Sequence, residues 1–129
     1  MTNTLEEVKM SIQQSFEEFN RGVRENDPKL IKKALKETWL NLVKAIDVLL
    51  LAKGFKEDEI KTHKQKRLAL DKLSLRDSVV EKLRDEFIAR EYNLYIRGVC
   101  EGEYDIEVLR KEIKKAKDLV EAISFIFHN

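Results

Sequence analysis

Arginine, asparagine and tyrosine gather in one short stretch, residues 89–98, with the sequence AREYNLYIRG. Arg90, Asn93 and Arg97 follow one another at steps of three and four, so they share one face if the stretch is helical. Arginine is well suited to bidentate phosphate contacts, and a tyrosine beside it could stack on a base. Arg90, Asn93, Tyr95 and Arg97 therefore form a candidate site for RNA or a nucleotide.

An ordinary structural role also accounts for this stretch. Tyr92 and Tyr95 would then pack in the protein core, while the arginines pair with Glu86, Glu91 or Glu101. The sequence leaves both interpretations open.

A second stretch, from Lys61 to Arg67, is basic and contains no acidic residue. Its side chains His63, Lys64, Lys66 and Arg67 are further candidates for contacts with an anion. A solvated face of a surface segment has the same composition, and this alternative stays open.

The other residues that could do chemistry are scattered. The four glycines lie apart rather than in a phosphate-binding loop. The two histidines, His63 and His128, do not form a motif such as His-Glu-x-x-His, and the single Cys100 allows neither an intrachain disulfide nor a multi-thiolate zinc site. No serine or cysteine nucleophile has a histidine base next to it in the sequence. The sequence therefore predicts no catalytic residue, no metal and no cofactor.

The charge balance narrows the class of protein further. The chain has 129 residues with 25 basic and 24 acidic groups, a formal net charge of +1, so electrostatics alone do not predict binding to bulk duplex DNA. Lysine and glutamate dominate the 38% of charged residues, a bias that resembles hyperthermophile proteins, although a mesophilic coiled-coil-like helical protein has the same composition. The single cysteine, the polar first ten residues and an apolar run no longer than residues 48–52 predict a soluble cytoplasmic protein without an export signal.

Apolar residues recur at steps of three and four through most of the chain, which predicts long amphipathic helices. We expect a first helix that starts at a Thr4 cap and ends near Asn26. Asp27 and Pro28 should start a second, central helix that closes at Gly54.

The stretch from Phe55 to Leu75 predicts a short helix, a basic surface segment and a turn. Ser74 should cap a further helix that stops at Gly98. After a loop, Asp105 should cap the last helix.

These elements predict an all-α fold, an antiparallel up-and-down bundle of about five helices in a single domain over residues 1–129. Phe125 and Phe127 cannot share one face of the last helix. One of them is therefore a candidate for a subunit interface, unless the end of the chain folds back onto the bundle.

Three stretches carry a family resemblance. They are residues 36–46 with the closing Gly54, the pair Thr62-His63 before a leucine-rich helix, and Asn93-Leu94-Tyr95 before a loop and a long last helix. With these stretches the chain resembles HEPN-type helical proteins (the higher eukaryote and prokaryote nucleotide-binding superfamily), in particular their archaeal PaREP-like branch. The resemblance covers nearly all of the chain from Asp27 onward.

The resemblance implies a helical bundle that is frequently a homodimer and often works beside a nucleotidyltransferase or in a toxin–antitoxin pair. Ribonucleases of this superfamily use an Arg-x4-6-His motif late in the fold. Arg90 stands where that arginine would be, but the residue five positions on is Tyr95, and no histidine follows before His128. Tyrosine, with a pKa near 10, is a poor base at neutral pH, so the resemblance supports the fold and not the nuclease activity.

Three functions follow as hypotheses. The leading one is a non-catalytic, homodimeric HEPN-like module that contacts RNA or a nucleotide and serves as an accessory to a partner protein. The second is a divergent metal-independent ribonuclease with Arg90 and Tyr95 in its site. The third is a structural protein that docks another chain through its last helix.

Overall fold

The computed structural model describes residues 2–102 and 105–128 and is helical nearly throughout. The five α-helices of this part of the chain are α1 (Thr2–Arg24), α2 (Pro28–Ala52), α3 (His63–Ser74), α4 (Ser78–Arg90) and α5 (Ile106–His128). A short 3₁₀ helix, η1 (Glu57–Glu59), precedes α3, and a π-helix, η2 (Glu91–Cys100), continues α4. No strand occurs in residues 2–102 and 105–128.

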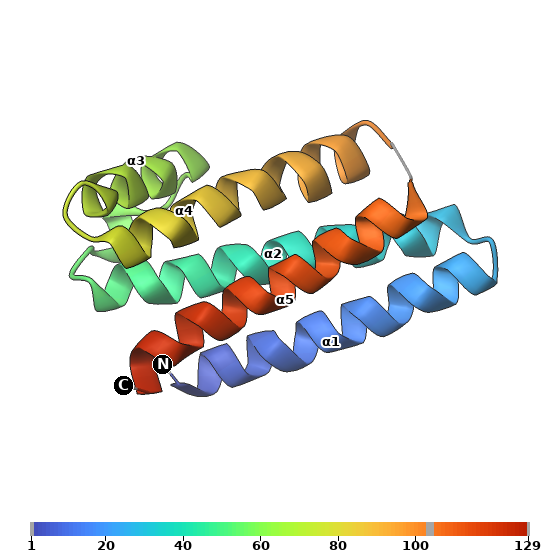
Figure 1. The fold of residues 1–129 in the computed structure, drawn as a ribbon, viewed down its shortest axis with the longest axis horizontal. Helices are drawn as coiled ribbons and strands as arrows, with labels where there is room; N and C mark the ends of the chain where they lie inside the picture. Colours follow the sequence, from blue (N-terminus) through green and yellow to red (C-terminus); the bar gives the residue numbers. More distant parts are fainter. Residues whose placement is uncertain (1, 103–104, 129) are drawn as a thin grey trace.

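The long helices run up and down beside one another, and the short α3 packs on α4 near the end of α2 (Figure 1). Helix α1 contacts both α2 and α5, and its first residues lie at the same end of the bundle as the last residues of α5. The prediction of an all-α antiparallel bundle is confirmed.

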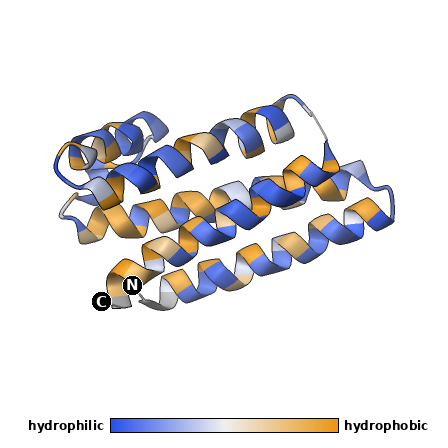
Figure 2. Ribbon diagram, in the orientation of Figure 1, coloured by the Kyte–Doolittle hydropathy of each residue, from blue (hydrophilic) through white to orange (hydrophobic). Residues whose placement is uncertain are grey.

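The core follows from the predicted apolar spacing. Each helix carries apolar and polar residues in alternating bands along its length (Figure 2). The central helix α2 places the largest number of side chains in the interior, in agreement with its broad apolar stripe; its core residues are Ile31, Ala34, Leu35, Trp39, Leu42, Ala45, Ile46, Val48, Leu49 and Leu50.

Aspartates start three of the helices by accepting hydrogen bonds from free backbone amides. Asp27 accepts from the N–H of Leu30 at 3.2 Å, and Asp105 accepts from the N–H of Val108 at 3.2 Å, as predicted. The predicted cap at Thr4 is wrong, because α1 already begins at Thr2.

Ser74 is not the cap of α4, which corrects a second prediction. Its hydroxyl donates to the carbonyl of Leu70 at 2.7 Å, inside α3. Asp77 is the cap instead, and its carboxylate accepts from the amides of Val79 and Val80. A carboxylate three residues later in the sequence was thus the stronger cap, since it satisfies two amides at once.

The basic stretch belongs to a helix rather than to an irregular segment. The Thr62 hydroxyl accepts from the amide of Gln65 at 3.0 Å, and the Gln65 side chain accepts from the amide of Thr62 at 2.9 Å. This reciprocal pair starts α3 at His63, so the predicted surface segment forms the first turns of α3.

Gly98 does not end a helix, as the sequence suggested, but lies buried within η2. A Cβ atom at this position would meet Leu35 Cδ1 at 3.0 Å, so the glycine permits a close approach to α2. In contrast, Gly54 has φ +102° and ends α2 as predicted. No helix in the described ranges is long and apolar enough to span a membrane.

Candidate functional site

Arg90 lies in the interior at the junction between α4 and η2. Its side chain is only 3% exposed, and its Nε donates to Glu112 Oε1 at 2.8 Å. Its NH1 group also donates to Glu86 at 3.3 Å. The pairing with Glu86 was one of the structural alternatives for this arginine. Arg90 is therefore an interior cation that joins α4 to α5, and it does not reach an external phosphate.

The two tyrosines of the cluster point to different environments. Tyr95 is partly buried against the core, with its ring centroid 5.8 Å from that of Trp39. Tyr92 is 55% exposed, and the guanidinium carbon of Arg97 lies 5.9 Å from the centre of its ring. Tyr92, rather than the predicted Tyr95, therefore offers its ring at the surface. Asn93 is half-buried beside it.

The four candidates of the basic stretch also separate by burial. Lys64 and Arg67 are exposed on α3, and His63 is partly buried. Lys66 is buried, donates to the carbonyl of Ile60 at 2.5 Å, and pairs with Asp47 of α2 at 3.1 Å. Lys66 thus fastens the start of α3 to α2, and only the other three candidates face solvent at least in part.

The contact with Lys66 and the partial burial of Asp47 act in opposite directions on the pKa of the Asp47 carboxyl. Burial raises the pKa of the Asp47 carboxyl, while the hydrogen bond and the positive charge of Lys66 oppose the rise. The pair lines a surface cavity of about 300 Å³ between α2 and the segment before α3, together with Leu51, Glu57 and Lys61.

The tertiary structure brings the two predicted stretches into direct contact at His63. Its Nε2 lies 2.5 Å from Glu91 Oε2, the first residue of η2. The imidazole also sits among aromatic rings, with its centroid 5.7 Å from that of Trp39 and 5.9 Å from that of Phe87. Residues about 30 positions apart in the sequence are therefore neighbours, a proximity that helical periodicity does not reveal.

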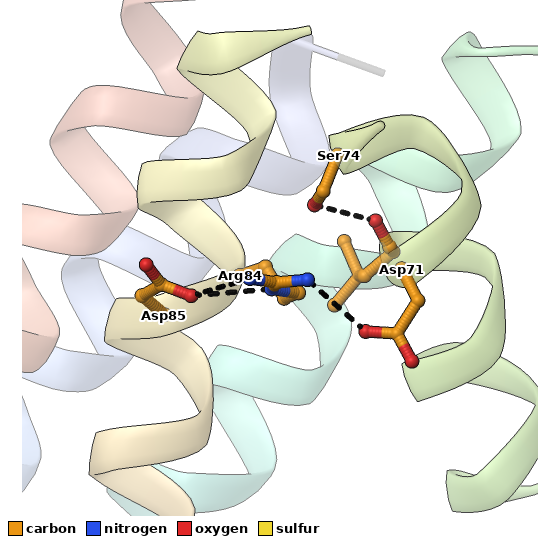
Figure 3. A network of polar contacts seen from close by, with 5 residues as sticks. Asp71, Ser74, Arg84 and Asp85 are labelled. Carbon is orange, nitrogen blue, oxygen red and sulfur yellow. Dashed lines mark hydrogen bonds and ion pairs between the residues drawn. The ribbon is translucent and has the colours of Figure 1, made fainter. Parts of the chain in front are cut away.

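A second ion pair lies between α3 and α4 at the surface. Arg84 of α4 contacts Asp71 of α3 at 3.5 Å and also holds Asp85 at 2.9 Å (Figure 3). Hydrogen bonds to Asp85, together with the charges of Asp85 and Asp71, raise the pKa of Arg84. Because His63 meets Glu91 and Asp71 meets Arg84, α3 runs antiparallel to α4 and its continuation η2.

Exposed or partly exposed cations, an apolar side chain and an aromatic ring lie on the elements that meet at the His63–Glu91 contact. We call this surface the α3–η2 face and define it by Lys64, Arg67, Ile88, Tyr92 and Arg97. Ile88 is 42% exposed and Tyr92 is one helical turn further along. The sequence offered a signal for Tyr92, since it follows Ile88 by four residues, but the aromatic spacing alone did not separate it from Tyr95.

The chemistry that this site supports is limited by its donor set. Within the described residues no group of three or more His, Cys, Asp or Glu side chains could hold a metal ion. Cys100 is exposed at the end of η2. On the α3–η2 face the polar groups are cations, and they lie beside the exposed Tyr92 ring and the His63–Glu91 pair.

The protein is an all-α bundle. Its α3–η2 face carries basic side chains and an exposed aromatic ring beside the π-helix η2. Comparisons with family models, with curated proteins and with solved structures gave no match. The HEPN resemblance therefore stays a prediction.

Proposed function

We propose that this protein is a non-catalytic, HEPN-like binding module that contacts single-stranded RNA or a nucleotide through the α3–η2 face. The observation that carries the proposal is the contact between His63 and Glu91, because it brings the start of α3, with Lys64 and Arg67, next to the start of η2, with Tyr92. Cations that follow a phosphate backbone, interleaved with an exposed aromatic ring, are the usual elements of a single-strand platform.

In this proposal each residue of the α3–η2 face has a role in binding. Lys64 and Arg67 contact phosphates, Tyr92 stacks on a base, and Arg97 supports the Tyr92 ring and adds charge. Arg90 and Tyr95 support this face from the interior, through Glu112 and Trp39 respectively. The near-zero net charge agrees with a local site rather than a wholly basic protein.

The test is a titration of labelled single-stranded RNA with the protein, followed by fluorescence anisotropy at several salt concentrations. For the double variant Lys64→Ala, Arg67→Ala we expect weaker binding and a log–log salt slope shallower by about 1.4, since each single-strand phosphate contact contributes about 0.7. Tyr92→Ala should cost about 1–3 kcal/mol of binding free energy, and Tyr92→Phe should keep most of it.

The matched control is Lys29→Ala with Lys32→Ala. It removes the same charge from exposed lysines at the start of α2, at the opposite end of this helix from α3. A flat anisotropy for the wild type, or equal losses in both double variants, would refute the proposed face.

We further propose that the protein acts as a homodimer beside a partner such as a nucleotidyltransferase, and that it comes from a thermophilic archaeon. Exposure at the end of α5 supports the dimer. Phe125 is 66% exposed, whereas Ile126 and Phe127 pack against the core. Ion pairs along the helices, such as Lys33 with Glu37, support the thermophilic source.

A further inference from the structure

We propose that His63 is a phosphoryl acceptor: its Nδ1 atom takes a phosphoryl group from a donor with a labile phosphorus–nitrogen or phosphoanhydride bond. The proposal rests on an imidazole that is held by a carboxylate at one nitrogen and reaches solvent at the other. It shares a surface with the proposed RNA contact but does not depend on RNA binding.

Glu91 determines which nitrogen carries the proton. At 2.5 Å from Glu91 Oε2, a lone pair on Nε2 would face a carboxylate oxygen, which is repulsive. The Nε2 atom is buried and forms no hydrogen bond, so it is the negative charge of Glu91 that favours the tautomer with its proton on Nε2. The lone pair of the neutral ring is therefore on Nδ1.

The rings of Trp39 and Phe87 fix the plane of the imidazole. Trp39 meets it edge-on at an interplanar angle of 63°, and Phe87 lies tilted at 47°. Both aromatic residues are buried, so they hold the ring without competing for its nitrogens. A fixed ring presents Nδ1 in one direction, which lowers the entropy cost of an attack on phosphorus.

Nδ1 is the reactive end of the ring because it reaches the surface. The His63 side chain is 34% exposed, and its Nε2 is buried. Among the described residues, Nδ1 forms no hydrogen bond and is not buried. A donor molecule can therefore approach this nitrogen from solvent.

Two exposed cations lie close to His63 along α3. Lys64 is the next residue, Arg67 follows His63 by one helical turn, and both are exposed. Arginine and lysine stabilise phosphoryl oxygens by charge and by hydrogen bonds. Glu91 lies at the opposite nitrogen, where it balances the positive charge of the phosphorylated ring rather than repelling the phosphate.

The step is balanced with phosphoramidate as the donor. The Nδ1 lone pair attacks phosphorus, the new nitrogen–phosphorus bond forms, and the bond to the donor nitrogen breaks. Ammonia leaves, and the phosphorylated ring keeps its Nε2 proton opposite Glu91. No atom is oxidised or reduced. A physiological donor of the same class would be a phosphohistidine on a partner protein or a nucleoside triphosphate.

The experiment incubates the full chain with phosphoramidate and identifies the isomer at each histidine by ³¹P NMR and by mass spectrometry of peptides. In an unfolded peptide the less hindered nitrogen is Nε2, which is farther from the backbone. We expect mainly the Nδ1 isomer at His63 in the folded protein and the Nε2 isomer after denaturation in urea. Absence of the adduct at His63, or the Nε2 isomer in the folded protein, would overturn the proposal.

Variants separate the role of Glu91 from a general effect on folding. Glu91→Ala should slow phosphorylation of Nδ1 about tenfold, because the group that orients the ring is lost. Glu91→Gln keeps the size of the side chain but removes the charge that favours a proton on Nε2, so it should also weaken the Nδ1 preference. His63→Gln should lose the adduct, and His128→Gln should keep it. An unchanged isomer ratio in Glu91→Ala would show that Glu91 does not position the ring.

Discussion

Arg90 and Arg97 have the same chemistry and lie seven residues apart, yet they serve different purposes. Arg90 is enclosed by Glu112 and Glu86, while Arg97 lies over the exposed Tyr92 ring. A buried arginine and a buried glutamate stabilise each other only as a pair, because either one alone leaves an uncompensated charge in the interior. Whether each arginine is buried or exposed depends on which helix packs against it.

This pairing predicts the effect of removing Arg90. Arg90→Ala should lower the free energy of unfolding by about 3–5 kcal/mol, because the buried Glu112 would keep only the more distant, exposed Lys115 at 3.7 Å as a partner. The double variant Arg90→Met, Glu112→Leu should recover most of the loss, since two apolar side chains need no compensation. Urea unfolding followed by circular dichroism measures both.

The control for this prediction is Arg84→Ala on the same helix. Arg84 also forms two ion pairs, but at the surface, and its removal should leave the urea midpoint nearly unchanged. Equal losses at Arg84 and Arg90 would contradict the assignment of Arg90 to the interior.

At the scale of elements, local chemistry decided where most helices start. The pairs Asp27-Pro28 and Asp105 with its following amides act within a few residues, so the sequence predicts them well. The sequence did not predict the start of α3, because a run of basic residues such as 61–67 is typical of a solvated segment, whereas the Thr62 and Gln65 pair starts a helix there. The sequence did not predict the π-helix, whose Gly98 lies so close to α2 that a Cβ atom there would meet Leu35 Cδ1 at 3.0 Å, a proximity that helical periodicity does not reveal.

Asp77 gives an element-scale prediction with a pH dependence. The backbone amides of Val80 and Val79, together with Lys53, hold the pKa of the Asp77 carboxyl below its usual value of 3.8. Its charge thus stabilises the folded state above pH 3.8, and this contribution is lost as the pH falls through the lowered pKa.

We therefore expect Asp77→Ala to cost about 1 kcal/mol of unfolding free energy at pH 7 and progressively less below pH 3.8. Asp77→Ser keeps a capping oxygen and should lose much less at pH 7. Urea titrations at both pH values measure the difference. A cost for Asp77→Ala that does not shrink in acid would mean that the carboxylate charge is not the source of the stabilisation.

At the scale of the whole molecule, the bundle places the first residues of α1 and the last residues of α5 at one end (Figure 1). Lys9 of α1 pairs with Glu121 of α5 there. Phe125 lies one turn beyond Glu121 and remains exposed, so this end offers the apolar surface that a second copy would cover.

The proposed dimer predicts a change in mass on substitution at this end. Phe125→Ser should shift the protein from dimer to monomer at micromolar concentration, as measured by light scattering. Val108→Ser is the matched control, since Val108 is 44% exposed at the other end of the same helix. A wild-type monomer, or a dimer that persists in Phe125→Ser, would exclude this interface.

The sequence by itself determined the all-α class, the apolar face of each helix and the caps at Asp27 and Asp105, because these depend on residues within one or two turns. It also located both basic stretches. Only the tertiary structure decided that Arg90 and Lys66 are interior cations, that Tyr92 rather than Tyr95 is exposed, and that His63 meets Glu91. Such outcomes depend on which helices pack together and in what register, and that information is not contained in the period of a single helix.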